Sequence, residues 1–173
     1  MKILVAYFSR AGGNYSGGGI LKLPVGNTEV AAKTIQRLTG GDLFRIETVR
    51  EYPDDYHRAT EVAKEEQSSD ARPELAGSVD NMEEYDLVVL GYPNWWGTMP
   101  MAVWSFLESY DFAGKAILPF CTHEGSGMGH SEADLGRLCP GAKLLAGLAI
   151  RGGSVKGAEK DISAWLRASG MIK

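Results

Sequence analysis

The chain has 173 residues, enough for one domain with a substantial core. Its apolar content of 44% and charged content of 23% are typical of a soluble globular protein. The formal net charge of −4, without a cluster of Lys and Arg, argues against nucleic acid as the main partner.

The cysteines and the first residues indicate the compartment. Cys121 and Cys139 lack CxxC spacing, so we expect two free thiols in a reducing cytoplasm. The apolar run at the start of the chain enters a polar loop after Phe8, which makes it too short for a signal peptide or a membrane span. We therefore expect a cytoplasmic protein without membrane contact.

Met1–Thr28 predicts a strand followed by an anion-binding turn. Ile3–Phe8 is a continuous apolar run, typical of a strand that is buried on both faces. Ser9 and Arg10 follow, and Gly26-Asn27-Thr28 then opens a helical pattern with Thr28 as the expected N-cap. The free N–H groups and the dipole of a first helical turn favour a bound phosphate.

The rest of the chain alternates between strand and helix patterns. Strands are expected at Asp42–Thr48, Asp86–Gly91, Lys115–Cys121 and Lys143–Ile150, and helices at Thr28–Thr39, His57–Ser69, Ala102–Leu107, Ser131–Leu138 and Val155–Arg167. Pro119 interrupts one predicted strand, so its missing N–H is expected at a bulge or an unpaired position. This alternation predicts a single α/β domain over residues 1–173, with a parallel sheet covered on both faces.

The loops after Phe8, Gly91 and Cys121 are the strongest functional signal. Ligands of such sheets bind beyond the carboxyl ends of the strands, where the strand order reverses, so these loops should converge. They offer hydroxyl and amide groups, two adjacent indoles, and closely spaced glycines beside an imidazole. A phosphate cradle next to flat apolar surfaces suits a phosphorylated, planar, heteroaromatic ligand, and FMN fits best.

Gly26-Asn27-Thr28, which opens a helix after the first strand, resembles the phosphate loop of the flavodoxins. The resemblance covers nearly the whole chain. It implies a doubly wound, five-stranded parallel sheet of order 2-1-3-4-5 with FMN at the switch point. It also implies the residues that bind the cofactor, which are Ser9, Arg10, Ala11, Asn27, Thr28, Pro93, Asn94, Trp95, Trp96, Gly97, Thr98, Thr122, His123, Gly125, Ser126 and Gly127.

The sequence departs from the flavodoxin pattern in three ways. Ala11 stands where a phosphate-binding hydroxyl is expected. Gly12–Val25 is an insertion, which we expect to form a surface flap near the phosphate, with glycines at its tip and Ile20, Leu21, Leu23 and Val25 packed onto the body. The tyrosine that stacks on the flavin from the later loop is absent, so either His123 or a tryptophan of the earlier loop takes its place.

Several aromatic and histidine residues are expected to have structural roles rather than functional ones. Trp104 and Trp165 lie in helical patterns and are expected in the core, whereas His57 is expected at the surface. No metal site is expected, because the histidines lack a matching ligand spacing. A hydrolase elbow is excluded because Glu124 replaces the outer glycine before Gly125-Ser126-Gly127, and no P-loop motif occurs.

The predicted function is an FMN-binding electron carrier that docks transiently with redox partner proteins at the exposed flavin edge. The alternative is an NAD(P)H-dependent FMN oxidoreductase that acts on quinones or similar acceptors. A non-redox module akin to a response regulator is disfavoured, because the first strand is not followed by an acidic pocket. In the carrier interpretation the chemistry belongs to the flavin, and no catalytic side chain is expected.

Overall fold

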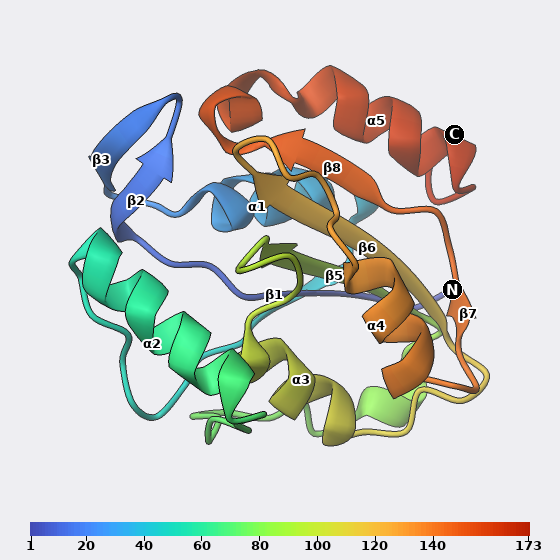
Figure 1. The fold of residues 1–173 in the computed structure, drawn as a ribbon. Helices are drawn as coiled ribbons and strands as arrows, with labels where there is room; N and C mark the ends of the chain where they lie inside the picture. The colour runs from blue at the N-terminus through green and yellow to red at the C-terminus, as the bar shows by residue number, and fades with distance from the viewer.

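The computed structural model describes residues 1–173 and has a parallel β-sheet at its centre (Figure 1). Its strands lie in the order β4 (Asp42–Arg45), β1 (Ile3–Tyr7), β5 (Leu87–Pro93) and β6 (Ala116–His123), with β7 (Lys143–Leu144) and β8 (Leu148–Arg151) both paired with β6. Every pairing within this sheet is parallel. With β7 and β8 as one interrupted strand, the predicted order 2-1-3-4-5 is confirmed.

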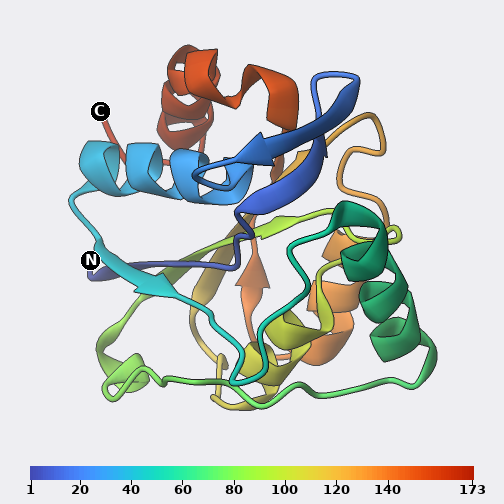
Figure 2. The same ribbon diagram turned by 90° about the vertical axis from the view of Figure 1, so that its left-hand side faces the viewer.

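Helices cover both faces of the sheet (Figures 1 and 2). On one face lie α1 (Asn27–Thr39) and α5 (Glu159–Ala168), and on the other α2 (Tyr56–Ser68), α3 (Met101–Glu108) and α4 (Ser131–Leu138). Two short 3₁₀ segments, Met82–Glu84 and Gly152–Gly157, complete the regular structure. Leu4 and Val5 belong to separate core clusters, because successive strand residues point to opposite faces. This explains why the first strand is apolar at every position.

The last predicted strand, Lys143–Ile150, is wrong as one continuous element. The residues of β7 pair with Ala116 and Ile117, and β8 resumes opposite Phe120. Pro119 is in register with Leu90 of β5, but toward β7 and β8 it lies in the interval between the two pairings, so the unpaired position expected for its missing N–H is found on that side. Gly147 fits the bend because an added Cβ would stand 3.1 Å from the Pro119 carbonyl oxygen and 2.7 Å from Met128.

Other boundaries also shift. Thr28 lies inside α1, and its expected role as N-cap is wrong, because Gly26 occupies that position without a side-chain cap. Gly40 ends this helix with a φ of 71°, as expected. β4 is shorter than the predicted strand at Asp42–Thr48, and α5 starts only at Glu159, after a 3₁₀ segment. None of the helices is long and apolar enough to cross a membrane.

The insertion forms an antiparallel hairpin, β2 (Gly12–Ser16) and β3 (Gly19–Leu23), which projects from the body beside α1 and α2 (Figures 1 and 2). Gly17 and Gly18 form its tip, as expected. The expectation that its apolar residues pack onto the body is wrong for Ile20, Leu21 and Val25, which are 51%, 52% and 39% exposed, whereas Leu23 is half-buried. The hairpin therefore adds little to the hydrophobic core.

Polar contacts fix the base of the hairpin instead. The Arg10 guanidinium donates to the carbonyl oxygens of Gly13, Pro53 and Asp54. The Gly13 N–H also donates to the Asp54 carbonyl at 3.1 Å. Because these bonds join the hairpin to the segment before α2, Arg10 acts here as an anchor for the flap.

Candidate functional site

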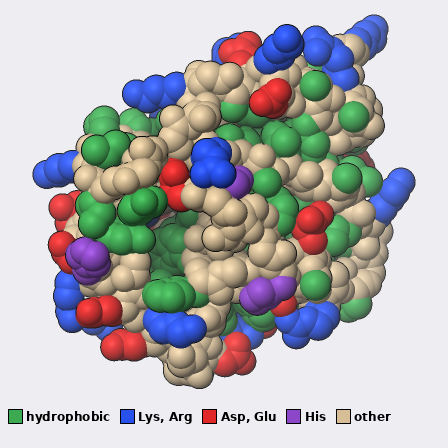
Figure 3. All heavy atoms as spheres, turned by 45° about the horizontal axis from the view of Figure 1, so that its top comes forward, with side chains coloured by type: hydrophobic (Ala, Val, Ile, Leu, Met, Phe, Trp, Pro, Cys, Tyr) green, Lys and Arg blue, Asp and Glu red, His purple; other side chains and the backbone are tan.

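The carboxyl ends of β1, β5 and β6 open into one cavity of about 220 Å³. Figure 3 shows it as a hollow with hydrophobic side chains along part of its rim. Predicted site residues that line it are Ser9, Arg10, Asn27, Thr28, Pro93, Asn94, Trp95, Trp96, Thr122, His123 and Ser126. Ala11, Gly97, Thr98, Gly125 and Gly127 are not part of the lining. The three loops thus converge as the strand order requires.

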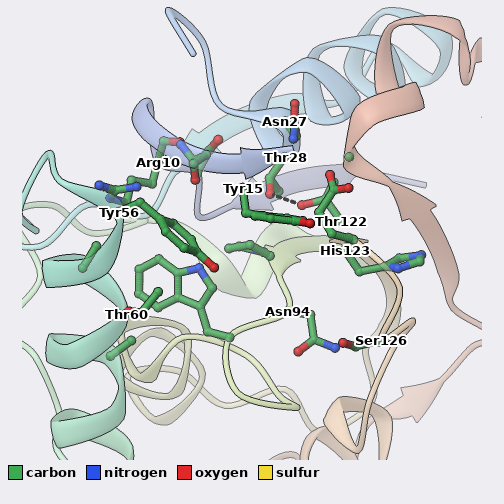
Figure 4. Close-up of a pocket in the computed structure, with 18 of the residues that line it drawn as sticks. Arg10, Tyr15, Asn27, Thr28, Tyr56, Thr60, Asn94, Thr122, His123 and Ser126 are labelled. Atoms are coloured by element: carbon green, nitrogen blue, oxygen red, sulfur yellow. Dashed lines mark hydrogen bonds between the residues drawn. The ribbon is translucent and has the colours of Figure 1, made fainter. Parts of the chain in front are cut away.

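Hydroxyl and N–H groups gather at the start of α1, at one end of the cavity (Figure 4). The buried Ser9 Oγ accepts a hydrogen bond from the Glu29 N–H at 3.0 Å. The hydroxyls of Thr28 and Thr122, on α1 and β6, lie 2.8 Å apart. No acceptor within the protein pairs with the N–H groups of Asn27 and Thr28, which leaves these two donors of the first turn of α1 free for an anion.

Gly26 allows this cradle to form. A Cβ at this position would stand 2.2 Å from Ser9 Oγ and 2.6 Å from the Arg10 carbonyl oxygen. Only a residue without a side chain therefore lets the start of α1 approach the loop after β1 so closely.

The charged side chains near the cradle are already bonded to other groups of the protein. Glu29 is buried in the first turn of α1, and its carboxylate pairs with Arg45 and with Lys33, the latter at 3.2 Å. Arg10 lines the cavity, but its guanidinium is bonded to backbone carbonyls, so it is not a free counter-charge. The donor set is therefore neutral, with Ser9, Asn27 and Thr28 as its side chains.

The loop after β5 makes a tight turn that exposes one indole. Trp95 N–H donates to the Thr98 carbonyl at 2.9 Å, and both central residues, Trp96 and Gly97, have positive φ values of 55° and 88°. Trp95 packs edge-on against Phe8, with ring centroids 5.1 Å apart. Trp96 is 52% exposed and holds α2 through a bond from its Nε1 to the Thr60 carbonyl at 3.0 Å. Both indoles still line the cavity.

The loops after β5 and β6 are bonded to each other. The Asn94 side chain accepts from the Gly97 N–H and donates to the Gly127 carbonyl, both at 2.9 Å. The His130 N–H donates to the Gly97 carbonyl at 2.8 Å. Gly97 and Gly127 thus join the two loops through hydrogen bonds, and neither lines the cavity.

Asp134, on α4, is bonded to residues of both loops. Its buried carboxylate accepts from the Thr98 hydroxyl at 2.5 Å, from His130 Nδ1 at 2.8 Å and from Arg137. Burial raises the pKa of Asp134, but the hydrogen bonds from these three partners outweigh it and leave the pKa below its usual value.

We expect Asp134→Asn to destabilise the protein by about 2 kcal/mol at neutral pH, since it removes the charge that these donors stabilise. A carboxyl with a depressed folded-state pKa stabilises the fold above its unfolded-state pKa, and that contribution is lost as the pH falls through the folded-state pKa. Urea unfolding at neutral and acidic pH should therefore show the two proteins converging in acid. A constant difference at every pH would contradict this role for Asp134.

Aromatic residues missed by the sequence analysis also line the cavity. Tyr15 comes from the hairpin and Tyr56 from the start of α2, with ring centroids 6.3 Å apart (Figure 4). The remaining residues of the lining are Asn14, Ala59, Thr60, Ala63, Glu124 and Gly152. Tyr15 lies in the insertion expected to form a surface flap, and Tyr56 precedes the helix expected at His57–Ser69, so no local pattern points to either position.

His123 lines the cavity without stacking across it. Its Nδ1 accepts from the Gly125 N–H at 2.9 Å, which orients the ring toward its own loop. Burial, with a smaller effect of Arg151, lowers the pKa of His123, so the imidazole is neutral at pH 7. Tyr15 and Tyr56 add further aromatic surface to the lining, from the hairpin and α2.

Solved structures resemble the whole chain. A candidate flavoprotein from Bacteroides eggerthii is 30% identical, with a TM-score of 0.78 and 96% of each chain covered. A flavoprotein from Lactobacillus acidophilus in complex with FMN is 18% identical, with a TM-score of 0.65 over 90% of this chain and 97% of the other. Oxidised flavodoxin 2 from Bacillus cereus is 21% identical, with a TM-score of 0.52 over 97% of this chain and 99% of the other.

No curated protein matches the chain, but the family model described as flavodoxin matches residues 2–169. The site fits that match, because free N–H groups and hydroxyls at a helix start suit a phosphate monoester, and the adjoining aromatic walls suit a planar ring. The chain therefore belongs to the flavodoxin family, whose cofactor is FMN.

Proposed function

We propose that the protein is an electron carrier that binds FMN in this cavity, with the phosphate at the start of α1. The observation that carries the proposal is the free first turn of α1 beside Ser9, in one cavity with Trp95 and Trp96. Bound FMN supplies the electron-transfer chemistry, while the chain positions the ring and limits its contact with water.

Each part of the lining has a role in this proposal. Ser9, Asn27 and Thr28 bind the phosphate together with the backbone N–H groups of α1. Trp95 is braced by Phe8 and presents a rigid apolar surface to the ring. Trp96 lies at the rim, where its exposed indole meets a redox partner protein that docks transiently at the flavin edge. Cys121 and Cys139 are free and buried, which agrees with a reducing cytoplasm.

A second candidate is an NAD(P)H-dependent oxidoreductase that reduces quinones or similar acceptors. Tyr15 and Tyr56 favour it, because they line the cavity and offer flat surfaces to a small aromatic acceptor. A carrier, in contrast, needs an open flavin edge for a protein partner.

Anaerobic mixing of the FMN-loaded protein with NADPH distinguishes these candidates. The carrier proposal predicts no rapid bleaching of the flavin by NADPH alone, and bleaching once a catalytic amount of a flavodoxin-reducing enzyme is added. Rapid bleaching without a second protein, followed by reoxidation on addition of a quinone, would overturn the carrier in favour of the oxidoreductase.

A further inference from the structure

Glu124 is the one carboxylate in the lining of the cavity, and it is close to the predicted phosphate cradle. An added Cβ at Gly152 would stand 2.5 Å from the Asn27 amide nitrogen and 2.6 Å from Glu124 Oε1, so both atoms flank the same point. The glycine at this position lets the carboxylate and the cradle amide approach each other. A negative charge thus lies beside a site that is built for a negative ligand.

This carboxylate is not neutralised by its surroundings. Its Oε1 is buried and has no hydrogen-bond partner, and its Oε2 accepts only from the Gly17 N–H, at 3.1 Å. Arg151 donates to the Glu124 backbone carbonyl at 3.1 Å and makes no ion pair with the side chain. Glu29, the other carboxylate near the start of α1, differs because it pairs with Arg45 and Lys33.

The same carboxylate holds the tip of the hairpin. Gly17 donates to Glu124, and Asn27 donates to the Ser16 hydroxyl at 3.2 Å. The hairpin is thus bonded near its tip both to Glu124 and to Asn27 of the cradle. A phosphate at the start of α1 would share the cavity with the Glu124 carboxylate, the one acidic side chain of its lining.

We propose that Glu124 sets how strongly the site discriminates between flavins with and without a phosphate: its carboxylate opposes the phosphate of FMN electrostatically and leaves uncharged riboflavin unaffected. The inference rests on the proposed placement of FMN. Wild-type protein still prefers FMN, because the hydroxyl and N–H donors of the cradle outnumber this single opposing charge. Glu124 therefore lowers the preference without reversing it.

The test compares FMN with riboflavin in Glu124→Gln. This change removes the charge but keeps an oxygen that can accept from the Gly17 N–H. We expect FMN to bind about tenfold more tightly, because the change removes the repulsion between two like charges in a partly solvated site. The affinity for riboflavin should change less than about twofold. High salt should shrink the gain, because ions screen partly solvated charges.

Two further variants complete the test. Glu124→Ala removes both the charge and the bond to the hairpin, and should also raise the ratio of FMN to riboflavin affinity. Glu83→Gln makes the same change of net charge at an exposed 3₁₀ segment before β5, at the opposite end of the sheet, and should leave the ratio unchanged.

An unchanged ratio in Glu124→Gln, or equal weakening of both flavins, would overturn the inference, the latter because Glu124 would then contact a part that both flavins share. Wild-type protein that binds neither flavin would refute the proposed function, and the inference with it. Normal FMN binding by wild-type protein with no change of ratio in the variants refutes the inference alone.

Discussion

Gly26→Ala is expected to weaken FMN binding by about 100-fold. The new Cβ would stand 2.2 Å from Ser9 Oγ and 2.6 Å from the Arg10 carbonyl oxygen, so the start of α1 must move away from the loop after β1. Charge-assisted hydrogen bonds of N–H groups to phosphate contribute about 1.5–3 kcal/mol each, so misplacing one or two of them gives a loss of this size. Calorimetric titration with FMN measures it directly.

The matched control is Gly136→Ala on α4. A Cβ at this position meets nothing within 4 Å, and alanine favours a helix over glycine by up to about 1 kcal/mol. This variant should bind FMN normally and unfold at the same or a slightly higher temperature. If Gly26→Ala bound FMN as tightly as the control does, the start of α1 could not be the phosphate site.

Deletion of Gly12–Val25, with Ala11 joined to Gly26, has the second largest expected effect. The two ends that the deletion connects are close together, since a Cβ built on Gly26 would lie 2.9 Å from the carbonyl carbon of Arg10. The shortened protein should fold, since β2 and β3 are not strands of the central sheet and the hairpin exposes Ile20 and Leu21. FMN should bind about tenfold more weakly, because the deletion removes the wall formed by Tyr15.

Circular dichroism and FMN titration test the deletion together. Leu21→Ser is the control, because it makes the exposed surface of the hairpin more polar and leaves the cavity lining intact. It should change neither the melting temperature nor FMN affinity. An unfolded deletion product would show that the hairpin is needed for the fold, and unaltered FMN affinity would show that it takes no part in the site.

The sheet and the three loops could be predicted because their signals are local. Ile3–Phe8 is apolar at every position, since β1 is buried on both faces, and parallel strands place the loops after Phe8, Gly91 and Cys121 at one edge. The chemistry of these loops favours FMN, and the family resemblance adds which of their residues contact it. Most of the site could therefore be predicted from the polar and aromatic residues that follow the strands.

The remainder depends on contacts between segments that are distant in sequence. Tyr15 enters the cavity because the base of the hairpin is anchored through Arg10, whereas in the sequence it is an aromatic residue in a glycine-rich segment. Tyr56 lines the cavity because α2 begins beside the hairpin. In the sequence, Glu124 is notable only because it replaces a glycine of the hydrolase motif. Its position near Asn27 follows from the close approach of both side chains to Gly152, which the sequence does not indicate. None of these relations has a local sequence pattern.

Fluorescence titration of the flavin-free protein with FMN and, separately, with riboflavin tests the central claim most directly. A phosphate held by charge-assisted hydrogen bonds at the start of α1 predicts one FMN bound per chain, at least about tenfold more tightly than riboflavin, with Thr28→Ala weakening FMN alone. Equal affinity for the two flavins, or equal losses for both in Thr28→Ala, would contradict the phosphate cradle, and no binding of FMN would contradict the account as a whole.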